Sequence, residues 1–259
     1  MTAGWRGWVL VGALALGACA SSEEAQILPP DAQYARALAL YEAQDWRDAV
    51  RAFQTFTFNY PQDPRVTDAR WLTAEAYFAA EDWATAAQEY LGFQRDYPTD
   101  PRAAEALFRG ARSYQRLSLR PQLDQRDTQR AIGIYDRVLA EYPRSDFADT
   151  ARESRARLRN KLAEKEYLNA EFYFDHEDWK ASEIYATRLV RQYPDSDWLP
   201  AAYALLARAR CEQGLEADAA RAYRALTELY PDSPAARVVG GQLTPRCRGE
   251  GLAPEAADE

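Results

Sequence analysis

The sequence has little of the chemistry that enzymes use. Its 259 residues include one histidine, His176, three cysteines and one methionine. No glycine-rich phosphate loop follows a strand pattern, and the histidine and cysteines are not spaced as metal ligands. His176 precedes Asp178 and Trp179 in a polar stretch, which is typical of a solvated turn. The sequence therefore predicts no catalytic residue, no metal and no cofactor.

Positive charge is also in the minority. Thirty-two lysines and arginines face 40 aspartates and glutamates, a net charge of −8. Nucleic-acid binding needs a dense cationic surface that displaces counterions, so we expect no nucleic-acid partner. Hydrophobic residues make up 47% of the chain and aromatic residues 12%, which is enough to build a core and excludes a largely disordered protein.

The apolar stretch from Trp8 to Ala18 is too short to span a bilayer. Arg6 precedes it, and it leads into Leu16-Gly17-Ala18-Cys19, which matches the lipobox of bacterial lipoproteins. The match implies that residues 1–18 are a signal peptide, removed before Cys19. An ordinary signal peptide followed by a chance cysteine is the alternative.

The lipobox match also implies that Cys19 carries S-diacylglycerol and a further N-acyl chain, palmitate. Several acyl chains hold a protein on a membrane from which a single chain would dissociate. Ala20 and Ser21 follow, without the aspartate that marks inner-membrane retention in enteric bacteria. We therefore expect a lipid anchor in the outer membrane, facing the periplasm, with residues 19–30 as a polar tether.

One turn motif recurs five times and reveals an internal repeat. The motif is a Tyr-Pro pair followed by Asp or Ser, and it occurs at Tyr60-Pro61, Tyr97-Pro98, Tyr142-Pro143, Tyr193-Pro194 and Tyr230-Pro231. Proline has no amide proton and clashes with the preceding turn, so each pair is expected to end a helix. The spacing is 37 residues in the first and last intervals, and the two middle intervals carry insertions of 8 and 14 residues.

Small residues keep the same phase in every copy. They stand at Ala37, Ala74, Ala111, Ala170 and Ala207, and again twelve residues later, or later still where the third copy has its insertion, at Ala49, Ala86, Ala131, Ser182 and Ala219. Small side chains let two helices approach closely, and an aromatic residue follows one helical turn later in most copies. This pattern predicts an all-α tetratricopeptide-repeat solenoid of five helical hairpins.

The insertions divide the solenoid. Eight extra residues between Tyr114 and Thr128 predict a longer loop inside the third hairpin, and the Gly- and Pro-free run from Phe147 to Phe174 predicts one long linking helix. The predicted parts are repeats 1–3 in residues 31–143, the long helix with repeats 4–5 in residues 144–240, and a disordered tail rich in Gly, Pro and Glu in residues 241–259.

In such arrays the first helix of each hairpin lines the inner groove. The repeat phase nominates aromatic side chains there, followed by two arginines one turn apart; the candidates for a peptide-binding groove are Tyr34, Tyr41, Trp71, Phe78, Phe108, Arg112 and Arg116, with Tyr167 and Phe174 in the fourth copy. The arginines would hold a carboxylate while the rings hold apolar side chains. Packing between adjacent repeats is the other interpretation of these rings.

Two further features stay open at this stage. A basic run on the predicted long helix is a candidate docking patch, with Arg152, Arg155 and Arg159 as its main residues, continued by Arg157, Lys161 and Lys165; a solvated helix face is the alternative. Cys211 and Cys247 form a possible disulfide in a compartment that permits one, although Cys211 would also suit a small buried apolar position.

The chain from about residue 30 to 240 resembles the BamD family, the tetratricopeptide-repeat lipoproteins of the outer-membrane β-barrel assembly machinery. The resemblance rests on three segments: Arg112-Ser113-Tyr114 with Leu117-Ser118-Leu119; Asp124-Gln125 with Thr128 and Ala131; and Leu158, Leu162-Ala163, Lys165-Glu166-Tyr167, Ala170 and Phe172-Tyr173, followed by Trp179 and Tyr193-Pro194-Asp195.

The resemblance implies a scaffold subunit of this BAM complex. Its C-terminal half would dock a periplasmic domain of the barrel-inserting subunit, and its N-terminal half would receive the C-terminal signal of unfolded outer-membrane proteins; other BAM lipoproteins are further expected partners. Three alternatives stand beside it. They are a pilotin-type tetratricopeptide lipoprotein that escorts a secretin, another cell-envelope scaffold, and an enzyme built around His176.

Overall fold

The computed structural model describes residues 27–251. The predicted signal peptide, Cys19 and most of the tether lie outside the described residues, as do residues 252–259. Within the described range all regular structure is helical. The helices are α1 (Pro30–Glu42), α2 (Trp46–Asn59), α3 (Val66–Ala79), α4 (Trp83–Asp96), α5 (Ala103–Leu117), α6 (Arg126–Glu141), α7 (Ala148–Asp175), α8 (Trp179–Gln192), α9 (Leu199–Glu212), α10 (Glu216–Leu229) and α11 (Pro234–Val239), followed by the short 3₁₀ helices η1 (Gly240–Gln242) and η2 (Arg246–Arg248).

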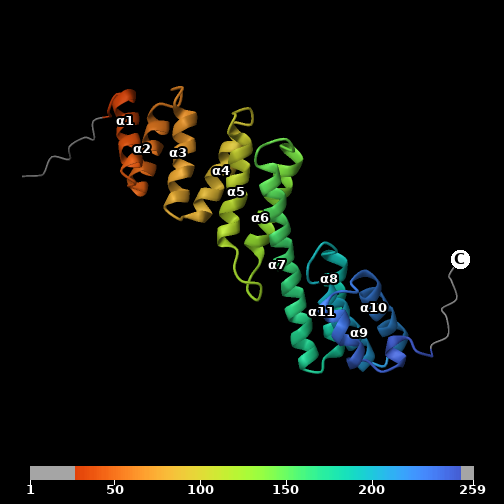
Figure 1. Ribbon diagram of the computed structural model, residues 1–259. Coiled ribbons are helices and arrows are strands. Elements are labelled where there is room, and N and C mark those ends of the chain that lie inside the picture. The colour runs from red at the N-terminus through yellow and green to blue at the C-terminus, as the bar shows by residue number, and fades with distance from the viewer. Residues whose placement is uncertain (1–26, 252–259) are drawn as a thin grey trace, which may run out of the picture.

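Consecutive helices pair into five antiparallel hairpins that stack into an elongated array (Figure 1). The hairpins are α1 with α2, α3 with α4, α5 with α6, α7 with α8, and α9 with α10. Each helix packs mainly against its neighbours in sequence, which is the contact pattern of a solenoid. The prediction of a five-hairpin tetratricopeptide-repeat solenoid is confirmed.

The small residues of the repeat occupy the closest helix contacts. All ten positions are fully buried: Ala37, Ala74, Ala111, Ala170 and Ala207 on the first helices, and Ala49, Ala86, Ala131, Ser182 and Ala219 on the second. The aromatic side chains that follow on the second helices, Phe53, Tyr90 and Tyr135, are also fully buried. Small residues bring the helices together and large rings fill the space beside them, so the core is a row of hairpin interiors.

The five second helices end where the Tyr-Pro motif predicts. Each stops at the residue before the tyrosine, whose own N–H still donates to the carbonyl four residues back. The proline then excludes a helical conformation for that tyrosine. Within four hairpins the turn between the two helices uses a residue with positive φ, namely Gln44, Glu81, Glu177 and Gly214.

Helix α7 is the long linking helix. It has 28 residues, which corresponds to about 42 Å, and it extends from the third hairpin into the fourth (Figure 1). Its first part packs against α6, and its later part packs against α8 and α9. The predicted insertion in the third hairpin forms the loop 118–125. In the span from 27 to 251, no helix is both long and apolar enough to cross a bilayer.

The prediction of a disordered tail from residue 241 is wrong for residues 241–251. This segment folds back on the last hairpin, with η2 against α10, and Leu243 and Cys247 are buried. A disulfide joins Cys247 to Cys211 on α9, with their Cα atoms 5.7 Å apart. Two buried apolar contacts and a covalent bond offset the low helix propensity of its glycines and prolines.

Candidate peptide-binding cleft

The predicted aromatic residues lie on the first helices, but they pack mainly inside their own hairpins. Tyr34 contacts Phe56 at a ring-centroid distance of 5.1 Å, and Trp71 contacts Phe93 at 5.4 Å. Tyr41 meets Trp46 edge-on at 5.2 Å. These rings are half-buried, so the packing interpretation holds for one face of each.

Arginines of the following hairpin cover the other face of several rings. Arg65 lies over Tyr34 at 5.2 Å, and Arg102 and Arg109 lie over Trp71 at 5.5 and 5.6 Å from the ring centre. Cation–π stacking of this kind is favourable and is characteristic of arginine. On the groove surface of the first two hairpins, guanidinium groups therefore lie over two of the predicted rings, Tyr34 and Trp71.

The covering arginines differ in whether a carboxylate neutralises them. Arg65 pairs with Asp63, Arg102 pairs with Asp100, and Arg109 pairs with Glu75 and Glu105, all at 2.7–2.9 Å. These ion pairs compensate the charge of the three arginines and engage part of their donor groups.

Arg112 and Arg116 on α5 differ from these three arginines. Arg112 lies over Phe78 at 5.8 Å and Arg116 over Trp83 at 5.5 Å, and both side chains are exposed. Among residues 27–251 neither forms an ion pair with a carboxylate. Their N–H donors remain available on the groove side of α5.

These two arginines line an open cleft of about 780 Å³ together with Phe108. The structure thus brings together three of the predicted groove residues and leaves Tyr34, Tyr41, Trp71 and Phe78 outside this cleft. The other lining residues are Gln115 on α5, Tyr135 on α6, Asp146 and Phe147 in the turn before α7, and Thr150, Ser154 and Arg157 on α7.

The cleft has an apolar floor and a basic rim. Phe108 is only 7% exposed, packs against Tyr135 at 5.8 Å and stacks on Phe147 at 5.2 Å. Burial raises the pKa of Tyr135, against the opposing effects of the Ser154 hydroxyl and the charges of Arg112 and Arg157. The tyrosine therefore stays neutral and supports Phe108 from beneath, where its hydroxyl donates to Gln115 Oε1 at 2.6 Å.

Arg157 adds a third positive charge to the cleft. The sequence predicted that Arg157 belongs to the docking patch instead. It donates to Ser154 Oγ at 2.9 Å, and its one ion pair, to Glu153, is long at 3.7 Å and exposed. Asp146 is the single carboxylate in the lining. Phe147 and Arg157 belong to α7 and the turn before it, so only the packing of α7 against α6 shows that they share a site with α5.

The predicted docking patch is largely neutralised. Arg159 holds Asp195 through two hydrogen bonds of 2.7 and 3.0 Å, Arg155 Nε lies 2.8 Å from Asp136, and Arg152 pairs with Asp149. These carboxylates come from the same helix or from neighbouring elements. The three arginines therefore do not form one free cationic surface, and their docking role stays a prediction.

The remaining candidates have structural contacts. Tyr167 stacks on Trp198 at 4.9 Å and donates to Glu171, and Phe174 packs against Trp179 with Arg208 above it at 4.1 Å. His176 is exposed, and its Nδ1 lies 2.7 Å from the carbonyl oxygen of Phe172. Within the described part of the chain, no group of three or more His, Cys, Asp or Glu residues is arranged to hold a metal ion.

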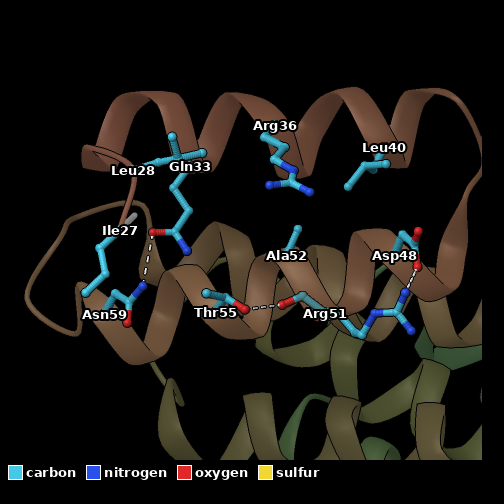
Figure 2. A pocket seen from close by; sticks show the side chains of 10 residues that line it. All are labelled: Ile27, Leu28, Gln33, Arg36, Leu40, Asp48, Arg51, Ala52, Thr55 and Asn59. Carbon is cyan, nitrogen blue, oxygen red and sulfur yellow. Dashed lines mark hydrogen bonds and ion pairs between the residues drawn. The ribbon is translucent and has the colours of Figure 1, made fainter. Parts of the chain in front are cut away.

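A second hollow lies at the N-terminal end, between α1 and α2 (Figure 2). Its volume is about 450 Å³, and its lining mixes Leu40 and Ala52 with the ion pair of Asp48 and Arg51. Ile27 and Leu28 close one side of it. The chain enters the folded body here, since Tyr60 Oη donates to the carbonyl oxygen of Leu28 at 2.5 Å.

Comparisons with known proteins place the chain in a family. A family model named YfiO and described as outer membrane lipoprotein matches residues 28–226. Over 114 residues the chain is 29% identical to the outer membrane protein assembly factor BamD of Vibrio cholerae; the alignment covers 42% of this chain and 47% of that protein. The chain thus matches about half the length of this curated relative.

Solved structures give more distant likenesses. The TPR2AB domain of yeast Sti1 has a TM-score of 0.39 and 17% identity, covering 82% of each chain. A tetratricopeptide repeat protein from Parabacteroides merdae has a TM-score of 0.36 and 13% identity, covering 85% of this chain and 74% of the other. The family model covers more than half of the sequence, and on that basis this chain belongs to the YfiO family of outer membrane lipoproteins.

Proposed function

We propose that this chain is a non-catalytic, lipid-anchored scaffold of the outer-membrane β-barrel assembly machinery, and that the cleft on α5 binds the C-terminal residue of unfolded barrel proteins. The observation that carries the proposal is that Arg112 and Arg116 lie beside the apolar floor of the cleft and form no ion pair with a carboxylate of the described residues. Family membership and the assembly-factor name of the Vibrio cholerae relative support it.

The ligand chemistry follows from the cleft. A C-terminal carboxylate is a planar anion that arginine binds through charge-assisted hydrogen bonds. An aromatic last residue would place its ring against Phe147, which is half-buried, and bury apolar surface there. A peptide that continues past its last residue has no carboxylate at that point, so the cleft would select chain ends over internal segments.

Binding of a synthetic peptide tests this site. The probe is a labelled ten-residue peptide ending in Phe, with a free carboxylate or with a C-terminal amide, and the readout is fluorescence anisotropy. We expect Arg112→Ala and Arg116→Ala each to weaken binding of the free acid about tenfold or more, because a hydrogen bond to a charged group contributes ~1.5–3 kcal/mol. The amide should bind to the unchanged protein about as weakly as the free acid binds to these variants.

A matched control is Arg224→Ala, which removes an exposed arginine on α10, far from the cleft in the array. It should leave binding unchanged. Equal affinity for the acid and the amide, or equal losses from Arg112→Ala and Arg224→Ala, would show that the cleft does not read a carboxylate.

The membrane and partner parts of the proposal need separate tests. Cys19 would carry the lipid and hold the solenoid on the periplasmic side, so Cys19→Ala should move the protein from the membrane fraction to the soluble fraction. Purification of the lipidated protein from its own envelope should recover a large β-barrel protein with periplasmic domains and its accessory lipoproteins. Recovery of a secretin instead would favour a pilotin, and the assembly role would then be wrong.

A further inference from the structure

The loop 118–125 between α5 and α6 does not line the cleft. It follows α5 and lies beside α7 (Figure 1). Eight residues without regular structure are normally mobile because their backbone groups bond to water. In this loop, by contrast, protein side chains donate to several of the backbone carbonyl oxygens.

A buried glutamine organises the loop from inside. Gln125 is 6% exposed, and its Nε2 donates to the carbonyl oxygens of Arg120 at 2.7 Å and Leu123 at 3.2 Å. Its Oε1 accepts from Thr128 Oγ1 at 2.7 Å, and Thr128 in turn bonds the Ser118 hydroxyl. One side chain thus joins the middle of the loop to both of its ends.

Two lysines of α7 hold the loop from outside. Lys161 Nζ donates to Ser118 Oγ at 2.8 Å and to the carbonyl oxygen of Leu119 at 2.9 Å, and Lys165 Nζ donates to that of Leu123 at 2.7 Å. The lysines are one helical turn apart on α7, so together they hold the loop at two points. These residues belong to the basic run of the sequence, and their contacts are to the loop.

Carbonyl oxygens satisfy the lysine donors without cancelling their charge. Within the described residues no ion pair joins Lys161, Lys165 or the exposed Arg120 to a carboxylate, and the loop's own carboxylate, Asp124, pairs with Arg126. The apolar side chains of Leu119 and Leu123 are 48% and 42% exposed beside this charge. The loop therefore presents two leucines in a fixed geometry on a locally positive surface.

We propose that this loop is a docking surface for a protein partner whose contact region is an apolar recess rimmed by carboxylates. A loop already fixed by Gln125 and two lysines loses little conformational freedom on binding, so its leucines can contribute most of their burial to affinity. The positive charge selects an acidic rim. This inference rests on the proposed function, because it takes the partner to be the barrel protein of the assembly machinery.

Site-specific crosslinking in the native envelope tests the proposal. Benzoylphenylalanine is placed at position 119 or 123 of the full lipidated chain, with position 229 as control, because Leu229 is 61% exposed on α10. After irradiation, mass spectrometry identifies the crosslinked peptide. We expect positions 119 and 123, and not 229, to crosslink the co-purifying barrel protein at a peptide that contains several Asp or Glu residues.

A charge reversal makes the test specific. Arg120→Glu changes an exposed side chain while leaving the carbonyl that Gln125 uses, so folding should be unchanged by circular dichroism. It should lower the crosslinking yield at position 123 about tenfold. An unchanged yield, a crosslinked peptide without acidic residues, or a crosslink to a second copy of this chain would overturn the proposal.

The two hypotheses fail in distinguishable ways. If the barrel protein co-purifies with the unmodified chain but positions 119 and 123 give no more crosslink than position 229, the proposed function stands and the docking loop is wrong. If no barrel protein co-purifies, the proposed function is wrong and the docking inference is wrong with it.

Discussion

Ser182 offers a test of how the hairpin contacts are built. It occupies the position that is alanine in the second helix of every other hairpin, and it is fully buried. Its hydroxyl oxygen has no hydrogen-bond partner in the described structure. A buried hydroxyl without a partner costs about 1–3 kcal/mol of desolvation free energy. We therefore expect Ser182→Ala to stabilise the protein.

The magnitude combines three terms. Removing the unpaired hydroxyl gains about 1–3 kcal/mol, and the better helix propensity of alanine adds roughly 0.5 kcal/mol. The void left by one oxygen atom costs only a few tenths of a kcal/mol at ~24 cal/mol per Å³. The free energy of unfolding should rise by about 1–3 kcal/mol, measured by urea titration of the protein made without residues 1–19.

Ser113 on α5 is the matched control. It is equally buried, but its hydroxyl donates to the carbonyl oxygen of Arg109 at 2.9 Å. Ser113→Ala loses that hydrogen bond, so its free energy of unfolding should stay the same or fall by up to about 1 kcal/mol. If Ser182→Ala were as destabilising as Ser113→Ala, the interpretation of Ser182 as an unsatisfied group would be refuted.

Three further changes test the fold at other points. Reducing the disulfide, or Cys211→Ser, should lower stability by up to about 3–4 kcal/mol, since Cys211 and Cys247 are 36 residues apart; unchanged urea unfolding would show that the bond does not stabilise the fold. Glu81→Gly should raise stability by about 1 kcal/mol, because Glu81 has φ of 60°; a lower midpoint of thermal unfolding would contradict this. Ala74→Leu should cost about 1–3 kcal/mol by overpacking a fully buried position, whereas Ala79→Leu, on the exposed end of α3, should cost little in the same assay.

Much of this architecture is readable from the sequence because it depends on local rules. A proline two residues beyond each second helix ends that helix wherever it stands, and a small residue at a fixed phase permits close helix contact in every copy. The long helix α7 and the loop before α6 follow from insertions and from the lack of Gly and Pro. These signals act within a few residues or repeat along the chain, so one sequence suffices to find them.

The fate of the charged groups depended on the tertiary structure. Arg109 and Arg112 are neighbours on the same helix, yet Arg109 meets Glu75 of the preceding hairpin, and Arg112 has no carboxylate within reach among the described residues. Likewise Lys161 and Lys165 belong to one basic run with Arg159, but they bind loop carbonyls while Arg159 binds Asp195. The sequence predicts that such residues face outward and does not determine their partners.

The cleft and the folded-back tail both depend on contacts between residues that are far apart in the sequence. Phe147 and Arg157 join Arg112 only because α7 packs beside α6 at a particular angle, and residues 241–251 fold back on the last hairpin, where Leu243 is buried and Cys247 is bonded to Cys211. The sequence by itself determined the helices, their order and their small-residue contacts, because those follow from turn and helix propensities over a few residues. The tertiary structure decided which charges are paired and which remain free, since that depends on distances between residues tens of positions apart in the chain.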